Sequence, residues 1–171
     1  MLIYLTGFMG AGKTTAGKKL AGMLGYTFID LDSQIEKETG LTIPELFKSG
    51  EHKFREIESM VLRNSLQTEN AVISCGGGTP CFNDNLAWMK SHGITVYIQM
   101  TTGGLFHRLS SSKQNRPLLA GKTDVELMEY IMETLKERAY FYTQCHYTVK
   151  GESLDVKELL SEIQRGEAQL R

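Results

Sequence analysis

A nine-residue segment near the start of the chain constrains the fold more than any other feature. Residues 7–15, GFMGAGKTT, follow the apolar run LIYLT at 2–6 and lead into a helical pattern at 13–24. Four positions satisfy the spacing G-x-x-x-x-G-K-[ST]: Gly7, Gly12, Lys13 and Thr14. Such glycines let a loop turn its backbone N–H groups toward an anion, and the following helix adds the positive end of its dipole. The segment therefore predicts a phosphate-binding loop rather than a glycine-rich turn with a solvated lysine.

Within this loop each residue type has a chemical part. We expect Lys13 to reach the β- and γ-phosphates of a nucleoside triphosphate and the Thr14 hydroxyl to bind Mg²⁺. The nucleotide would also contact the rest of the loop and the start of the helix: Gly10, Ala11, Gly12 and Thr15. Because phosphate-loop proteins include switches, motors and kinases, the remainder of the chain has to distinguish among them.

Short apolar runs alternate with helical patterns along the rest of the chain. After 2–6, the expected strands are 27–30, 71–75, 95–100 and 146–149. The expected helices are 13–24, one starting near Ser33, one with a capping box from Thr42 to Glu45, 54–66, about 124–143, and a last one capped by Ser153. Continuously apolar strands are typical of parallel sheets covered on both faces. The 171 residues therefore predict one α/β domain, with a doubly wound five-stranded parallel sheet flanked by helices.

The candidate polar residues fall where the expected strands end, which is where open parallel sheets bind ligands. Besides the phosphate loop, these are Asp30 and Asp32 after the second strand and the glycines 76–78 after the third. The third strand ends in Cys75 and offers no Walker B aspartate. The carboxylate near a metal ion must therefore come from another part of the chain.

Asp30 and Asp32 are the natural source of that carboxylate. They lie two residues apart at the end of a strand, so both side chains could point into one cleft. One would orient Mg²⁺ through its waters, and the other would accept the proton of an attacking hydroxyl. The alternative for Asp32 is to cap the helix that starts near Ser33. The phosphate loop in the same half of the chain favours the functional interpretation.

Two arginines are candidates for binding a substrate anion. Arg55 lies on a helix whose opposite face is apolar, and either clamps a carboxylate or phosphate or forms a surface ion pair with Glu56 or Glu58. Arg138 lies beside aromatic residues on the long helix, as a substrate anchor or a stacked structural arginine. The segment GGGTP at 76–80 brings backbone N–H groups to the same edge of the sheet, unless it is a plain tight turn.

A polar segment within about 110–123 is typical of a mobile lid. It contains Arg116 before Pro117, and Arg108 lies just before the segment. Because proline restricts the preceding residue to an extended conformation, Arg116 could project its guanidinium toward a transferring phosphoryl group. An ordinary surface loop is the alternative.

Composition limits the partners and the compartment. Nineteen Lys and Arg against twenty Asp and Glu give a net charge of -1, so no global field attracts nucleic acid or an anionic membrane. The three cysteines have neither disulfide nor zinc spacing, and the four histidines have no ligand spacing and receive no catalytic role. The chain shows neither a signal-peptide pattern nor an apolar run of about 18 residues. We expect a cytoplasmic protein with small-molecule substrates.

Six segments taken together closely resemble the shikimate kinase family, in the same order and over nearly the whole chain. They are GFMGAGKTT, FIDLD, FREIE, CGGGTP, NRPLL and ERAYFY. The phosphate loop alone is generic, whereas the paired aspartates, the Phe-Arg-x-x-Glu segment, the triple glycine and the Arg-Pro-Leu-Leu lid make the match specific. The resemblance implies a monomeric kinase that transfers the γ-phosphate of ATP, with Mg²⁺, to the 3-hydroxyl of shikimate in aromatic amino-acid biosynthesis.

Carried over by position, the resemblance gives the acceptor residues their roles. It puts the shikimate carboxylate between Arg55 and Arg138, helped by the backbone of Gly77 and Gly78. It also makes Asp32 the residue that holds the ring hydroxyls and the candidate base. The helical segment at about 33–66 would then bind the substrate.

The nucleotide side follows the same pattern. The resemblance implies that Asp30 supports Mg²⁺ beside Thr14, and that Lys13 bridges phosphates. It implies further that Arg116 arrives with the lid and that Arg108 packs against adenine.

Two other functions stay open from the residues alone. A kinase of gluconate or of a nucleoside monophosphate would also use two arginines, because they fit a phosphate as well as a carboxylate. A nucleotide-dependent switch would hydrolyse slowly and signal by its shape. Neither an N-K-x-D nor a D-x-x-G motif follows the third strand, which argues against the switch.

Overall fold

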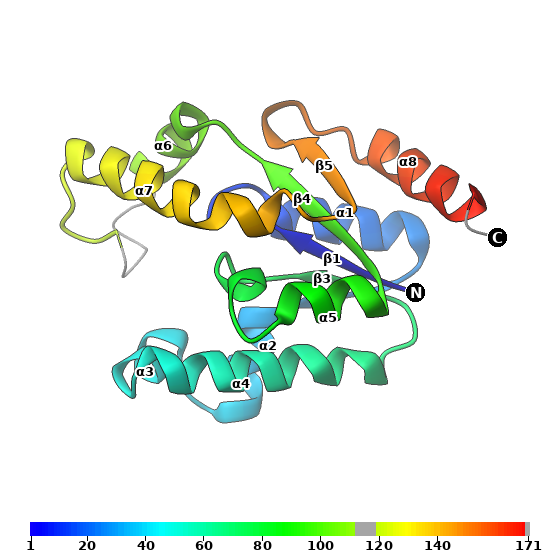
Figure 1. Ribbon diagram of the computed structural model, residues 1–171, viewed down its shortest axis with the longest axis horizontal. Coiled ribbons are helices and arrows are strands. Elements are labelled where there is room, and N and C mark those ends of the chain that lie inside the picture. The colour runs from blue at the N-terminus through cyan, green and yellow to red at the C-terminus, as the bar shows by residue number, and fades with distance from the viewer. Residues whose placement is uncertain (112–118, 170–171) are drawn as a thin grey trace.

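Five parallel strands form one sheet, in the order β2-β3-β1-β4-β5, in the computed structural model, which describes residues 1–111 and 119–169 (Figure 1). The strands are β1 (Leu2–Thr6), β2 (Thr27–Asp30), β3 (Ala71–Ser74), β4 (Ile94–Gln99) and β5 (Tyr147–Lys150). The central strand β1 pairs with β3 on one side and with β4 on the other. The connection after β1 leads to β2 at one edge of the sheet, and the connection after β3 leads to β4 on the other side of β1. Ligands bind in such folds where successive connections leave in opposite directions.

Helices cover both faces of this sheet (Figure 1). The α-helices are α1 (Lys13–Leu24), α2 (Leu31–Thr39), α3 (Ile43–Lys48), α4 (Glu51–Asn64), α5 (Asn85–His92), α6 (Thr102–Ser110), α7 (Asp124–Tyr142) and α8 (Val156–Gln169). Short 3₁₀ turns are η1 (Ser65–Gln67), η2 (Thr79–Cys81) and η4 (Gly151–Ser153). The predicted α/β fold with a five-stranded parallel sheet is confirmed.

Alternation along the central strand divides the apolar side chains between two cores. Ile3 and Leu5 face one side and pack with residues of α1, α6, α7 and α8. Leu2 and Tyr4 face the other side and pack with residues of α2, α4 and α5. Because successive strand residues point to opposite faces, a strand covered on both sides must be apolar throughout, as LIYLT is.

Most predicted boundaries are confirmed to within one residue at the strands. The helix expected at 13–24 ends at Gly25 in the left-handed conformation. The capping box of Thr42 and Glu45 is present at the start of α3. The expected cap of the last helix is wrong, because Asp155 rather than Ser153 accepts a hydrogen bond from the first turn, 2.7 Å from the Lys157 nitrogen.

Two further boundaries differ where the chain turns sharply. β2 passes directly into α2, so Asp30 rather than Asp32 is the N-cap, and its carboxylate accepts from the Ser33 nitrogen. The helix expected at 54–66 begins earlier, at Glu51, after a glycine. Among the described residues, no helix is both long and apolar enough to cross a membrane.

Candidate active site

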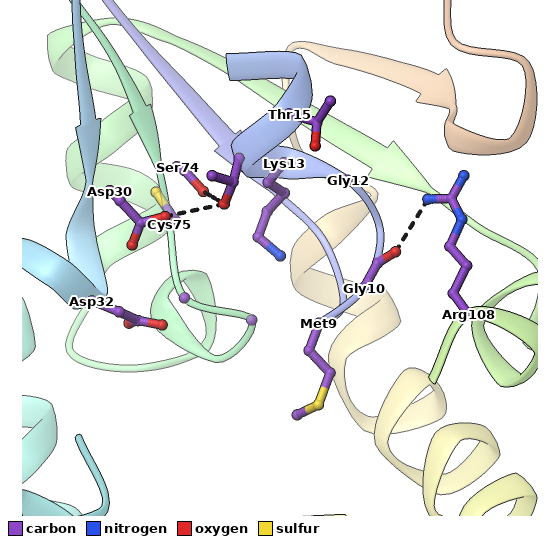
Figure 2. Close-up of a pocket in the computed structure, with 13 residues that line it drawn as sticks. Met9, Gly10, Gly12, Lys13, Thr15, Asp30, Asp32, Ser74, Cys75 and Arg108 are labelled. Carbon is purple, nitrogen blue, oxygen red and sulfur yellow. Dashed lines mark hydrogen bonds between the residues drawn. The ribbon is translucent and has the colours of Figure 1, made fainter. Parts of the chain in front are cut away.

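The phosphate loop opens a cleft of about 420 Å³ at the carboxyl edge of the sheet (Figure 2). Its lining comes from the loop, from the ends of β2 and β3 and from α6: Met9, Gly10, Gly12, Lys13, Thr14, Thr15, Asp30, Asp32, Ser74, Cys75, Gly76, Gly77 and Arg108. Segments that are far apart in the sequence therefore meet in one place. The cleft brings together most of the nucleotide-side candidates and the paired aspartates.

The loop depends on a glycine where β1 ends. Gly7 has a φ of 139°, and a Cβ there would lie 2.7 Å from the carbonyl oxygen of Ile98 on β4. Only glycine avoids both the backbone strain and the clash. The chain then turns back on itself through a bond from the Ala11 nitrogen to the Phe8 oxygen at 3.1 Å, before α1 begins.

Lys13 extends from the first turn of α1 into this cleft (Figure 2). It is 9% exposed, and its Nζ donates to the carbonyl oxygens of Gly7 at 2.8 Å and Phe8 at 2.9 Å. Burial lowers the pKa of Lys13 to about 8, although the charges of Asp32 and Asp30 oppose that shift. A bound phosphate would supply the negative charge that this buried amine lacks.

A cluster of oxygen atoms lies beside the lysine. The Thr14 hydroxyl donates to Asp30 Oδ2 at 3.1 Å and lies 3.5 Å from the Ser74 hydroxyl. The other oxygen of Asp30 caps α2, which fixes the carboxylate in this position. Ser74 was not among the sequence candidates, although its place at the end of β3 could have identified it. Hard oxygen ligands of this kind suit Mg²⁺.

Asp32 lies in the first turn of α2 and lines the same cleft as Asp30 (Figure 2). The prediction that both carboxylates share a cleft is confirmed, but the strand periodicity is not the reason, because the helix has begun at Leu31. Burial, and after it the charges of Asp30 and Glu58, raise the pKa of Asp32 to about 6 against the lowering effect of Lys13. A carboxylate with that pKa is a better proton acceptor near neutral pH than an ordinary aspartate.

Arg55 does form the expected ion pair with Glu58, but the pair is buried rather than at the surface. Its Nη1 donates at 2.8 Å to Glu58, which is 1% exposed, and Nε and Nη2 donate to the more exposed Glu51 at 3.3 and 3.1 Å. Glu58 in turn accepts from the Thr79 hydroxyl at 2.6 Å. The face of the guanidinium lies 4.1 Å from the centroid of the Phe82 ring. Two carboxylates and an aromatic ring therefore fix the position of this charge.

The glycine turn after β3 lies between the two candidate arginines. A Cβ on Gly77 would lie 2.9 Å from Arg138 Nη1, and a Cβ on Gly78 would lie 2.5 Å from Arg55 Nη2. The turn is therefore not a plain one, because the absence of side chains lets both guanidiniums approach its backbone. Arg138 also lies 5.9 Å from the centroid of the Phe8 ring, at the limit of a cation–π contact. Residues from α4, η2 and α7 thus converge beside the nucleotide cleft.

Arg108 closes the opposite side of the cleft from α6. Its Nη1 donates to the carbonyl oxygen of Gly10 at 3.1 Å (Figure 2). The same nitrogen donates to Ala11 at 3.1 Å, and Nη2 donates to Gly151 at 3.3 Å. The arginine thereby connects the phosphate loop with the segment after β5.

Part of the predicted lid lies outside the described residues. Arg116 and Pro117 fall within 112–118, so their positions in the expected site are not described. Leu119, at the other end of this segment, is fully buried in the core that contains α7. In this part of the expected lid, Leu119 packs against the domain, whereas Ala120, Gly121 and Thr123 are exposed.

Comparison with known proteins identifies a family. Residues 9–166 match the family model described as shikimate kinase. The shikimate kinase of Bacteroides thetaiotaomicron is 47% identical over 165 residues, covering 95% of this chain and 94% of that protein. A crystal structure of shikimate kinase from the same organism has a TM-score of 0.87 at 46% identity, covering 99% and 98% of the two chains. Shikimate kinase from Acinetobacter baumannii, solved in complex with shikimate, has a TM-score of 0.85 at 34% identity, covering 99% and 94%.

Proposed function

Because this chain belongs to the shikimate kinase family, we propose a division of its reaction among the residues of the cleft. The reaction itself is the transfer of the γ-phosphate of ATP to the 3-hydroxyl of shikimate, giving shikimate 3-phosphate and ADP in the shikimate pathway. The family does not favour the alternatives of a gluconate kinase, a nucleoside monophosphate kinase or a switch.

On the donor side, the phosphate loop holds ATP. We assign the phosphates to the loop and the first turn of α1: Gly10, Ala11, Gly12, Lys13, Thr14 and Thr15. The buried amine of Lys13 supports this assignment, because it exchanges two neutral carbonyl partners for charged phosphate oxygens. Arg108, which already contacts the loop, is assigned to the adenine end of the nucleotide.

The cofactor is Mg²⁺, and Thr14 and Asp30 would hold it. The described residues contain no cluster of three or more metal-ligating side chains, so the phosphates of ATP and water must supply most of the ligands. The Thr14 hydroxyl and the fixed carboxylate of Asp30 offer hard oxygen atoms that fit this ion. When bound, Mg²⁺ would neutralise charge on the phosphate oxygens.

On the acceptor side, Arg55 and Arg138 clamp the shikimate carboxylate, with the backbone of Gly77 and Gly78 between them. The observation that carries this assignment is the approach of both guanidiniums to that glycine pair, beside the cleft that contains Lys13. Forked guanidiniums bind a carboxylate more strongly than neutral donors do. The segment at about 33–66, which contains α3 and α4, contributes Arg55 to this acceptor side.

Asp32 accepts the proton of the attacking hydroxyl and also holds the shikimate ring. The phosphoryl transition state is loose, so positioning and charge neutralisation contribute more than the strength of the base. Arg116, which lies outside the described residues, is assigned to the transferring phosphoryl group together with the lid at about 110–123. Replacing Arg116 with alanine should therefore lower kcat severely.

The proton-acceptor role predicts an acidic limb in the pH profile. Because the pKa of Asp32 is raised to about 6, its carboxylate gains a proton as the pH falls through that value and stops accepting one. We expect kcat/KM for shikimate to fall about tenfold per pH unit below about pH 6. In Asp32→Asn, which should lower both kcat and shikimate affinity, this limb should vanish from the residual activity. An unchanged limb in that variant would contradict the role.

The close approach of Arg55 to Gly78 predicts that one added methyl group at Gly78 affects only shikimate binding. Gly78→Ala places a Cβ against the Arg55 guanidinium, which Glu58 and Glu51 hold, and so displaces it. We expect the KM for shikimate to rise by about fivefold or more, the lower end of the cost of overpacking, with the KM for ATP unchanged. Gly22→Ala on α1 is the control, because a Cβ there meets nothing within 4 Å. Equal kinetics in the two variants would argue against the clamp.

A coupled ADP-release assay tests the acceptor directly. Shikimate, gluconate and nucleoside monophosphates are compared at equal concentrations, and we expect turnover only with shikimate. Preferential turnover of gluconate or of a monophosphate would overturn the assignment. We also propose that the enzyme acts as a cytoplasmic monomer, as expected from the sequence and the family resemblance.

A further inference from the structure

Tyr142, the last residue of α7, reaches the glycine turn from a buried position. The side chain is fully buried, and its hydroxyl donates to the carbonyl oxygen of Gly77 at 2.6 Å. Arg138 lies four residues earlier on the same face of the helix and also approaches Gly77. Two side chains from one helix face therefore meet the same residue of the acceptor site.

The ring of Tyr142 is fixed independently of this hydrogen bond. It stacks on Tyr97 of β4, with ring centroids 4.8 Å apart and planes inclined by 21°. Tyr97 is itself buried and aligned with Thr6 at the end of β1. Burial raises the pKa of the Tyr142 phenol well above its usual range, so the group is a neutral donor at physiological pH. A phenol held in this way positions its partner rather than exchanging protons.

The geometry of the peptide group transmits this position to Gly78. The Gly77 carbonyl and the Gly78 N–H belong to one planar trans peptide, so they point in opposite directions. Fixing the carbonyl on Tyr142 therefore fixes the direction of the N–H away from Tyr142. Within residues 1–111 and 119–169, no acceptor pairs with the N–H of Gly78.

We propose that Tyr142 is a positioning residue for the acceptor: by holding the Gly77 carbonyl, it directs the Gly78 N–H toward the shikimate carboxylate and keeps the end of α7, with Arg138, against the glycine turn. This inference rests on the proposed roles of Gly78 and Arg138. Tyr142 lies outside the cleft, and the proposal gives it an effect on the affinity for shikimate but not on the affinity for ATP.

Tyr142→Phe tests the proposal, because it removes one oxygen atom and keeps the ring stacked on Tyr97. We expect the KM for shikimate to rise about 3- to 10-fold, with kcat and the KM for ATP within about twofold of the wild type. Tyr4→Phe is the matched control, since Tyr4 is also fully buried and its hydroxyl lies 3.2 Å from the hydroxyl of Ser65 on η1 rather than on the glycine turn. It should lose comparable thermal stability without any change in the KM for shikimate.

Tyr97→Leu is a second, independent variant, because it removes the ring that supports Tyr142 while the protein retains the Tyr142 hydroxyl group. The same selective rise in the KM for shikimate is expected. An unchanged KM for shikimate in both variants, or an equal rise in the two KM values, would overturn the proposal. If Arg138→Ala raises the KM for shikimate but neither tyrosine variant does, this inference alone fails. If the wild type does not phosphorylate shikimate, the proposed function fails instead.

Discussion

Lys13→Ala should lower kcat by about 10²- to 10³-fold, the largest effect of any single replacement at a described residue of the site. The amine is buried in the cleft, and its two hydrogen-bond acceptors are the neutral carbonyl groups of Gly7 and Phe8. A preorganised donor of this kind stabilises charge that develops during transfer, and its loss typically costs that factor. Steady-state kinetics with saturating ATP and shikimate measure the change.

Lys19→Ala is the control for this prediction. Lys19 lies on the same helix but is exposed, so its replacement makes the same change in charge and composition without touching the cleft. We expect its kcat to equal that of the wild type. Near-normal turnover in Lys13→Ala would contradict the assignment of the ATP phosphates to the phosphate loop, and with it the proposed donor side of the site.

Arg138→Ala should raise the KM for shikimate by about 10- to 160-fold and leave the KM for ATP nearly unchanged. A hydrogen bond between charged groups contributes about 1.5 to 3 kcal/mol, which corresponds to this range. Arg138 approaches the turn that we assign to the carboxylate, whereas we assign the other substrate to the phosphate loop. Initial rates with each substrate varied in turn separate the two KM values.

Arg55→Ala should show the same selectivity with an added loss of stability. Its removal leaves the buried carboxylate of Glu58 without a charged partner, and breaking a buried pair typically costs about 3 to 5 kcal/mol. Arg63→Ala on the same helix is the control for both arginines, because Arg63 bonds to Asn85 and to backbone groups away from the cleft. An unchanged KM for shikimate in Arg138→Ala would contradict the clamp.

The sequence predicts the layers of this fold well, because they depend on local patterns. The apolar run before a glycine-rich loop fixes β1 and α1, and the other strands are recognisable by their continuous hydrophobicity. Helices α5 and α6 were not specified. The apolar residues of α5 show almost no amphipathic periodicity, and α6 contains two adjacent glycines near its start. Their packing against the sheet, rather than their local sequence, makes them helical.

The candidate site was predictable residue by residue but not in its contacts. The motif and the family resemblance named Lys13, Asp32, Arg55 and Arg138, and among these the cleft itself is lined by Lys13 and Asp32. Sequence alone could not show that Arg55 is buried against Glu58, because that pairing depends on how α4 meets the turn after β3. Contacts between distant segments are set by tertiary packing, which local periodicity does not encode.

The backbone around the paired aspartates also differs from the one expected from the sequence. The spacing of two residues suggested a strand face, whereas the chain enters α2 immediately after Asp30. Asp30 therefore both caps the helix and accepts from Thr14, and Asp32 is directed into the cleft from the first helical turn. The shared cleft was predicted correctly for a reason that the local backbone does not support.

A crystal structure with MgADP and shikimate tests the central claim most directly: donor and acceptor occupy one cleft at the carboxyl edge of the sheet. We predict that the shikimate carboxylate lies within hydrogen-bond distance of the guanidiniums of Arg55 and Arg138. Its 3-hydroxyl should lie within reach of the Asp32 carboxylate and face the end of the nucleotide phosphates beside Lys13. Shikimate bound on a surface that does not open to the phosphate loop, or with its carboxylate away from both arginines, would contradict this account.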